Sequence, residues 1–152
     1  MFDIDGVVAD VRHRLHLLER RPKDWPGFFA AAADDPGLAE GINRVLAAVE
    51  HYEIVWLTGR PNSLRAVTRR WLADQGLPVT ELIMRGQRDF RPAPALKLAE
   101  LARLKARTIE LFVDDDAKVI AAAAEAGYPA VLADWMASSP VLSQAQDQVG
   151  RT

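Results

Sequence analysis

Short apolar runs alternate along the chain with longer segments whose apolar residues recur at helical spacing. The runs are short enough to be buried strands, and they lie at 1–5, 53–57, 82–84, 109–113 and 130–132. The segments with helical spacing lie at 38–52, 63–75, 95–107 and 117–126. This alternation predicts an α/β fold: a doubly wound, Rossmann-like open parallel sheet of about five strands with helices on both faces.

The segment 11–37 stands outside this alternation. Asp24-Trp25-Pro26 predicts a helix start, because Asp is favoured as an N-cap and Pro in the first turn. The segment is the size of a small lid rather than of a second domain, so we expect one domain over 1–152, capless or with a small helical lid within 11–37. The first strand is unusually short: either it is stunted or the chain is a piece of a longer protein. Another helix is expected from Trp135, followed by a loose tail.

Composition narrows the function classes. The 152 residues are 49% hydrophobic and 26% charged, as in soluble single-domain proteins. The formal net charge of −2 does not favour non-specific nucleic-acid binding. The absence of Cys excludes disulfides, a thiol nucleophile and a thiolate metal site, and it fits a reducing compartment. With no visible signal peptide and no long apolar run, we expect a cytoplasmic protein that makes no membrane contact.

The most informative stretch is Asp3-Ile4-Asp5-Gly6. Residues two apart on an extended strand point to the same side, so Asp3 and Asp5 should lie together, with Gly6 turning the chain away. Two carboxylates that close are costly unless a cation or a shared proton lies between them. The pattern therefore indicates a Mg²⁺ site or a nucleophile beside an acid/base, although a solvated turn of the calcium-binding type has the same residues.

Chemically active residues also follow the other predicted strands. Thr58-Gly59-Arg60 follows the second, Arg85 and Arg88 the third, and Asp114-Asp115-Asp116 the fourth. Parallel strands present their carboxyl ends at one edge, where ligands of such folds bind. The sequence thus predicts that acids, a hydroxyl group and basic groups converge there.

This set of residues predicts phosphoryl transfer assisted by a metal. Asp3 would attack phosphorus, and Asp5 would protonate the leaving oxygen and later deprotonate water. Thr58 and the Gly59 backbone N–H would hold phosphate oxygens, and Lys97 would offset the developing negative charge. The expected Mg²⁺ ligands are Asp3, Asp5, Asp114 and Asp115.

The set resembles the haloacid dehalogenase (HAD) superfamily of phosphatases, through Asp3-Ile4-Asp5-Gly6-Val7, Thr58-Gly59-Arg60, Lys97 and Asp114-Asp115. Within it, the chain looks like the 3′-phosphatase domain of phage-type polynucleotide kinases, whose hydroxyl-Gly-Arg motif and Thr-Arg-x-Trp helix match Thr58-Gly59-Arg60 and Thr68-Arg69-Arg70-Trp71. Met84-Arg85, Arg91 and Lys97 echo that family's next loop.

The resemblance implies a Mg²⁺-dependent phosphomonoesterase with an aspartyl-phosphate intermediate, acting on polynucleotide 3′-phosphate ends or nucleotides. It implies phosphate contacts from Arg60, Arg85 and an early arginine, for which Arg14 is the candidate and Arg12 the rival. The family tends to carry an acid where this chain has Pro92-Ala93-Pro94-Ala95. No G-x-x-x-x-G-K-[ST] run is present, so a kinase or ligase partner would be another domain or subunit.

Other interpretations stay open. The substrate could be a sugar phosphate or mononucleotide, and a receiver-type signalling domain also combines acids, Thr and Lys on an α/β fold, although its phospho-acceptor Asp would follow the third strand. His13 and His16 could be metal ligands, bases, or surface and substrate contacts. Arg65, Arg69 and Arg70 could form an anion-binding collar with the loop arginines or lie on a solvated helix face.

Overall fold

Parallel strand pairs form the centre of the molecule. The structure is a computed structural model that describes residues 1–19, 21–137 and 141. Strand β1 (Val55–Pro61) pairs in parallel with β2 (Glu81–Arg85), and β3 (Phe112–Asp114) pairs in parallel with β4 (Ala130–Leu132). Phe2 lies between the two pairs and forms parallel bridges to Trp56 of β1 and Val113 of β3.

In place of the expected sheet of about five strands, the described residues form four strands in two parallel pairs, and Phe2 bridges the two pairs. The first apolar run does not form a strand, because the chain turns at Ile4. The Ile4 carbonyl accepts the N–H groups of Val8 and Ala9, at 2.9 Å each. Gly6 allows this turn with a φ of +75°, a conformation that L side chains rarely adopt.

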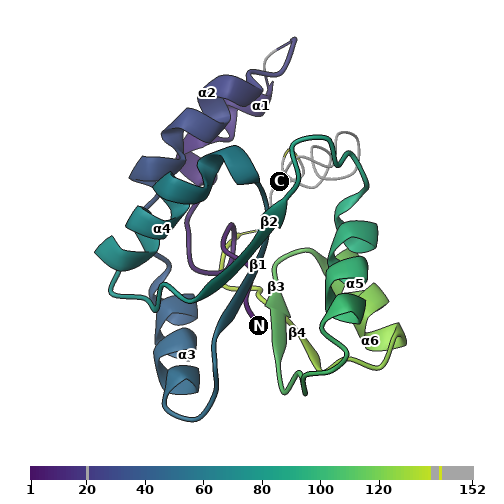
Figure 1. Cartoon of the computed structure of the whole chain (residues 1–152). Helices are drawn as coiled ribbons and strands as arrows, with labels where there is room; N and C mark the ends of the chain where they lie inside the picture. The colour runs from purple at the N-terminus through teal and green to yellow at the C-terminus, as the bar shows by residue number, and fades with distance from the viewer. Residues whose placement is uncertain (20, 138–140, 142–152) are drawn as a thin grey trace.

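Helices cover both sides of the strands (Figure 1). Helices α3 (Ala39–Val49) and α4 (Arg65–Asp74) lie on one side, and α5 (Ala93–Arg103) and α6 (Ala117–Glu125) lie on the other. A short 3₁₀ turn, Asn62–Leu64, precedes α4. The glycines expected to end helices, Gly76 and Gly127, have positive φ values of 70° and 87°.

The segment of the expected lid is helical. It contains a 3₁₀ turn (Arg12–Arg14), α1 (His16–Glu19), α2 (Trp25–Ala30) and a second 3₁₀ turn (Ala31–Asp34). Asp24 caps α2, since its Oδ1 accepts the Gly27 N–H at 2.9 Å. Together with Met136, from beyond β4, this segment forms a separate apolar cluster that contains Val11, Leu18, Trp25 and Phe28.

Strand β1 is longer than predicted. Thr58-Gly59-Arg60, expected in a loop, belongs to its carboxyl end, where the register with β2 shifts between Thr58 and Pro61. Such an irregularity bends a strand and re-aims its side chains. The helix expected from Trp135 falls mostly outside the described residues. Among the helices of the described chain, none has the length and apolar character needed to cross a bilayer.

The turn after Ile4 packs directly on α3. A Cβ at buried Gly41 would overlap the carbonyl oxygen of Val7, which also accepts the Trp135 indole N–H at 2.8 Å. Gly41→Ala should therefore lower the free energy of unfolding by about 1–3 kcal/mol through overpacking. At an ordinary interior position of a helix, the same substitution would instead stabilise the helix, because the helix propensity of Ala is more favourable than that of Gly by about 1 kcal/mol.

Urea unfolding followed by circular dichroism measures the effect of Gly41→Ala. Asn43→Ala is the matched control, because it adds a better helix former at an exposed position of α3 and should not destabilise. A Gly41→Ala protein as stable as the wild type would show that the turn does not depend on this close approach.

Candidate active site

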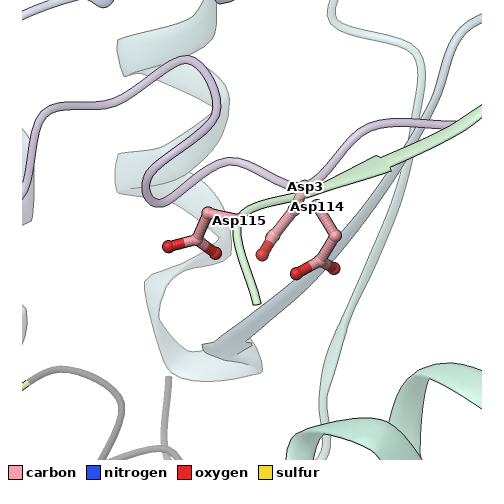
Figure 2. A group of neighbouring side chains, drawn as sticks. All are labelled: Asp3, Asp114 and Asp115. Atoms are coloured by element: carbon pink, nitrogen blue, oxygen red, sulfur yellow. The ribbon is translucent and has the colours of Figure 1, made fainter. Parts of the chain in front are cut away.

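Three acids from distant parts of the sequence meet at the carboxyl edge of the strands. The Asp3 N–H donates to the Val113 carbonyl at 2.9 Å, which places Asp3 beside the end of β3. Asp114 is the last residue of β3 and Asp115 follows it. One carboxylate oxygen from each of the three lies within 4.8 Å of the others. Figure 2 shows the three side chains side by side.

This cluster has the oxygen ligands of a divalent-cation site and an oxygen that is free to bind the ion. Its oxygen atoms are the ligands that hard cations such as Mg²⁺ prefer. Asp115 Oδ1 is buried and has no hydrogen-bond partner. Gly6 makes room for Asp115, because a Cβ at Gly6 would overlap the Asp115 carboxylate.

Lys97 joins the cluster from α5. Its Nζ donates to Oδ2 of Asp3 and to Oδ2 of Asp114, each at 2.5 Å. Although burial favours a neutral amine, these two carboxylates raise the pKa of Lys97, so it is charged. Lys97 is 3% exposed, and its interior position lets its charge act with little screening by water.

One ammonium group does not balance three carboxylates. Burial raises the pKa of Asp3, Asp114 and Asp115, and for Asp114 the value reaches about 7. Repulsion between the acids acts in the same direction, while Lys97 opposes it. A bound divalent cation would supply the missing positive charge, so the residues present fit Mg²⁺.

Asp5 lies outside this cluster, although we expected it among the metal ligands. Its Oδ1 accepts hydrogen bonds from Arg14 Nη2 at 2.9 Å and from Arg60 Nε and Nη2 at 2.9 and 2.5 Å. Burial alone would raise the pKa of Asp5, but Arg60 and Arg14 outweigh it and hold that pKa below its usual value. The other oxygen, Oδ2, is buried without a hydrogen-bond partner.

A second buried acid, Asp35, shares both arginines. Arg14 donates from Nε and Nη2 to its two oxygens at 2.7 Å each, and Arg60 Nη2 donates to Oδ2 at 2.6 Å. Trp71 donates its indole N–H to the Asp35 carbonyl at 2.8 Å. Arg14 and Arg60 are fully buried, so the two predicted phosphate contacts are anchored between Asp5 and Asp35. Arg60 keeps one buried nitrogen, Nη1, without a partner.

The remaining predicted phosphate contacts lie at the ends of β1 and β2. Thr58 is buried, and its Oγ1 accepts the Arg60 N–H at 3.2 Å. Arg85 donates from Nε to the Gly59 carbonyl at 3.3 Å and from Nη1 to the Arg91 carbonyl at 2.7 Å. Arg85 Nη2 is buried without a hydrogen-bond partner, and burial lowers the pKa of Arg85.

Asp35 is the site residue that sequence reasoning missed. It lies in Asp34-Asp35-Pro36-Gly37, which we interpreted only as a helix break, and no feature of that run distinguishes Asp35 from Asp34. His13 Nε2 lies 2.8 Å from Asp35 Oδ1, and His16 Nδ1 lies 3.0 Å from the His13 carbonyl. Within the described chain, neither histidine belongs to a cluster that could hold a metal.

Fold and site together are those of a HAD-type phosphatase domain. The sequence matches the HAD-type family described as the polynucleotide kinase PNKP phosphatase domain over residues 1–132, and the chain belongs to this family. No curated protein matches it.

Two solved structures share the fold. A chain of a Pnkp1/Rnl/Hen1 RNA repair complex is 24% identical with a TM-score of 0.70, and the match covers 86% of this chain and 40% of that one. A chain from another Pnkp1/Rnl/Hen1 complex is 22% identical with a TM-score of 0.71, over 90% and 45% of the respective chains. The present chain thus spans less than half the length of either.

The Asp35 network leads to a stability prediction. Asp35→Ala would leave two buried guanidinium groups with one carboxylate, and removing one partner of a buried ion pair costs about 3–5 kcal/mol of unfolding free energy. Urea unfolding measures the loss. Asp34→Ala, at the exposed neighbouring position, is the control and should be close to neutral. Equal effects of the two substitutions would contradict a structural role for Asp35.

Proposed function

We propose that this domain is a Mg²⁺-dependent phosphomonoesterase that removes phosphate from the 3′ ends of polynucleotides. One observation carries the proposal: in a chain of the PNKP phosphatase family, Lys97 and the acids Asp3, Asp114 and Asp115 converge at one strand edge. This arrangement supplies a nucleophile, a fixed positive charge and a cation site within one small volume.

Asp3 is the proposed nucleophile. Its carboxylate oxygen attacks phosphorus, the bond between phosphorus and the ester oxygen breaks, and an aspartyl-phosphate and a free hydroxyl end result. Water then attacks the same phosphorus, releasing inorganic phosphate and restoring the carboxylate. Lys97, in contact with Asp3, stabilises the negative charge of both steps.

Asp5 is the proposed acid/base. Two residues beyond Asp3, it gives a proton to the leaving oxygen in the first step and takes one from water in the second. Its ionised form, which Arg14 and Arg60 stabilise, is the form required for the second step. In the first step, the substrate phosphate competes for the same two guanidinium groups and so favours the protonated form.

The phosphate would be held by groups that have spare donors. Arg60 Nη1 and Arg85 Nη2 are buried without partners, and Thr58 and Gly59 directly precede Arg60 at the carboxyl end of β1. Arg14, which donates to Asp5, would contact the phosphate from the side of the segment 11–37. A dianionic phosphate supplies acceptors for each of these donors.

Asp3, Asp114 and Asp115 would hold the Mg²⁺ ion. When bound, the ion would neutralise carboxylate charge and orient the phosphate. The Asp5 carboxylate, which we also expected to bind the ion, is instead held by the two arginines, so its proposed role is proton transfer.

The proposed setting of the domain is nucleic-acid repair. The Pnkp1/Rnl/Hen1 chains are about twice as long as this one or longer, so here the kinase or ligase activity would belong to another domain or subunit. We also propose a cytoplasmic location, which the absence of cysteine supports.

A substrate panel tests the proposal. It compares 3′-phosphorylated and 5′-phosphorylated oligonucleotides, mononucleotides, sugar phosphates and a generic aryl phosphate by phosphate release. The 3′-phosphorylated oligonucleotide should give the highest kcat/KM. A higher kcat/KM for a sugar phosphate would support the phosphatase activity but reject a polynucleotide as the substrate.

Asp3→Asn should abolish turnover, because it removes the nucleophile at almost no change in volume. Phosphate release and the thermal unfolding midpoint are measured together, so that lost activity is distinguished from lost fold. Asp74→Asn, at an exposed position of α4, is the matched control and should keep full activity. Near-normal turnover by Asp3→Asn would reject the mechanism.

Mg²⁺ should raise the thermal unfolding midpoint, because a ligand that binds only the folded state stabilises it, by about 2.7 kcal/mol at one hundred times its Kd. EDTA should reverse this rise and stop phosphate release. Asp115→Asn should abolish the thermal shift, whereas Asp134→Asn, an exposed acid after β4, should keep it. Activity that is indifferent to EDTA would exclude the metal site.

A further inference from the structure

A cavity of about 420 Å³ lies beside Arg85, where β2 ends. This volume falls in the range of ~300–1,000 Å³ that is typical of small-ligand sites. Its walls come from α2, the end of β1, the 3₁₀ turn Asn62–Leu64, and the end of β2 with the loop that follows it. The side chains that matter here are Phe29, Ser63, Arg85, Arg88 and Phe90.

The cavity adjoins the proposed phosphate site through Arg85. The same side chain lines the cavity, donates to the Gly59 carbonyl, and is attracted electrostatically by Asp3. Its Nη2 atom is buried without a hydrogen-bond partner. A phosphate near Asp3 and Arg85 would therefore have this cavity next to it, as space for the group to which the phosphate is esterified.

Two aromatic side chains from different elements line this space. Phe29 belongs to α2 and is half-buried, whereas Phe90 belongs to the β2–α5 loop and is 61% exposed. A singly exposed Phe is ordinary, but these two rings line one concave space beside the arginines. Aromatic side chains bind nucleobases by stacking, with little dependence on the base.

The charges of the cavity favour an anionic ligand. Arg85 and Arg88 contribute positive charge, and the one acid, Asp89, is already paired: Arg91 donates to both of its oxygens from Nε, at 3.0 and 3.1 Å. This pairing holds the pKa of Asp89 at about 2. Arg88 is exposed, as a residue that meets a polymer backbone would be.

We propose that this cavity binds the terminal nucleoside of a single-stranded polynucleotide whose 3′-phosphate lies at Asp3. The base lies against Phe29 and Phe90, and the adjoining backbone phosphate lies near Arg88. This inference rests on the proposed function and deepens it, because it assigns a binding site to the leaving group. A mononucleotide would fill only part of the site, and a sugar phosphate would leave the aromatic walls unused.

The test compares a 3′-phosphorylated single-stranded oligonucleotide, the 3′-phosphorylated mononucleotide and glycerol 2-phosphate, which has no base. In the wild type, kcat/KM should fall in that order. Phe90→Ala should reduce the ratio of kcat/KM for the oligonucleotide to that for glycerol 2-phosphate about ten- to one-hundredfold, which is the range expected when one base loses its stacking partner. Arg88→Ala should weaken the salt dependence of the oligonucleotide reaction, by about 0.7 in the logarithmic slope for one phosphate contact.

The controls are Tyr52→Ala and Arg103→Ala. Tyr52 is an exposed aromatic residue before β1, at the opposite end of the strands, and Arg103 is exposed in the last turn of α5. Both variants should keep the wild-type ratio and salt dependence. A Phe90→Ala protein with an unchanged ratio, or with equal losses on all three substrates, would overturn the inference.

The wild type distinguishes failure of the inference from failure of the proposed function. If it hydrolyses glycerol 2-phosphate but prefers no oligonucleotide, the phosphatase proposal stands and the nucleoside site is rejected. If it hydrolyses none of the three esters with Mg²⁺ present, the proposed function fails and the inference fails with it.

Discussion

The structure depends on the cost of holding like charges together in its interior. Asp3 comes from the start of the chain and Asp114 and Asp115 from the end of β3, and they meet at a site where Asp3 and Asp114 are buried and Asp115 is half-buried. Their repulsion and desolvation oppose folding unless positive charge compensates them. Lys97 supplies part of that charge by contacting two of the acids. The proposed Mg²⁺ ion would supply the positive charge that Lys97 leaves uncompensated, so on this proposal the cost of burying the acids and the affinity for the ion have the same origin.

A second set of buried charges lies next to the first but is compensated differently. Arg14 and Arg60 share Asp5 and Asp35, so two positive side chains match two negative ones. These ion pairs hold Asp5 and both arginines in place. The division leaves the carboxylates of Asp3, Asp114 and Asp115 available to a cation, whereas Asp5 is held by the two arginines, which fits its proposed role in proton transfer. The segment 11–37, expected as a lid, contributes Arg14 and Asp35 to this network.

Sequence patterns predicted most of this arrangement, because strand ends are visible in a sequence. Once the apolar runs were recognised, the acids and basic residues that follow them had to lie at one edge, and Asp3, Asp114 and Lys97 do so. Spacing could not reveal how Asp5 is partnered. Residues two positions apart on a regular strand share a face. Because the chain turns at Ile4, however, the Asp5 side chain contacts the arginines and does not lie beside Asp3 in the cluster of acids. Nor could local pattern identify Asp35, whose role depends on contacts 21 and 25 residues away.

The most direct test is to find where the phosphate is during turnover. The domain is mixed with Mg²⁺ and a 3′-phosphorylated oligonucleotide, the reaction is quenched in acid within one turnover, and the modified residue is located by mass spectrometry. Our account predicts phosphate on the Asp3 carboxylate, in the wild type and not in a protein that lacks this carboxylate. Phosphate on any other residue, or turnover that leaves no phosphorylated protein while inorganic phosphate is released, would contradict it.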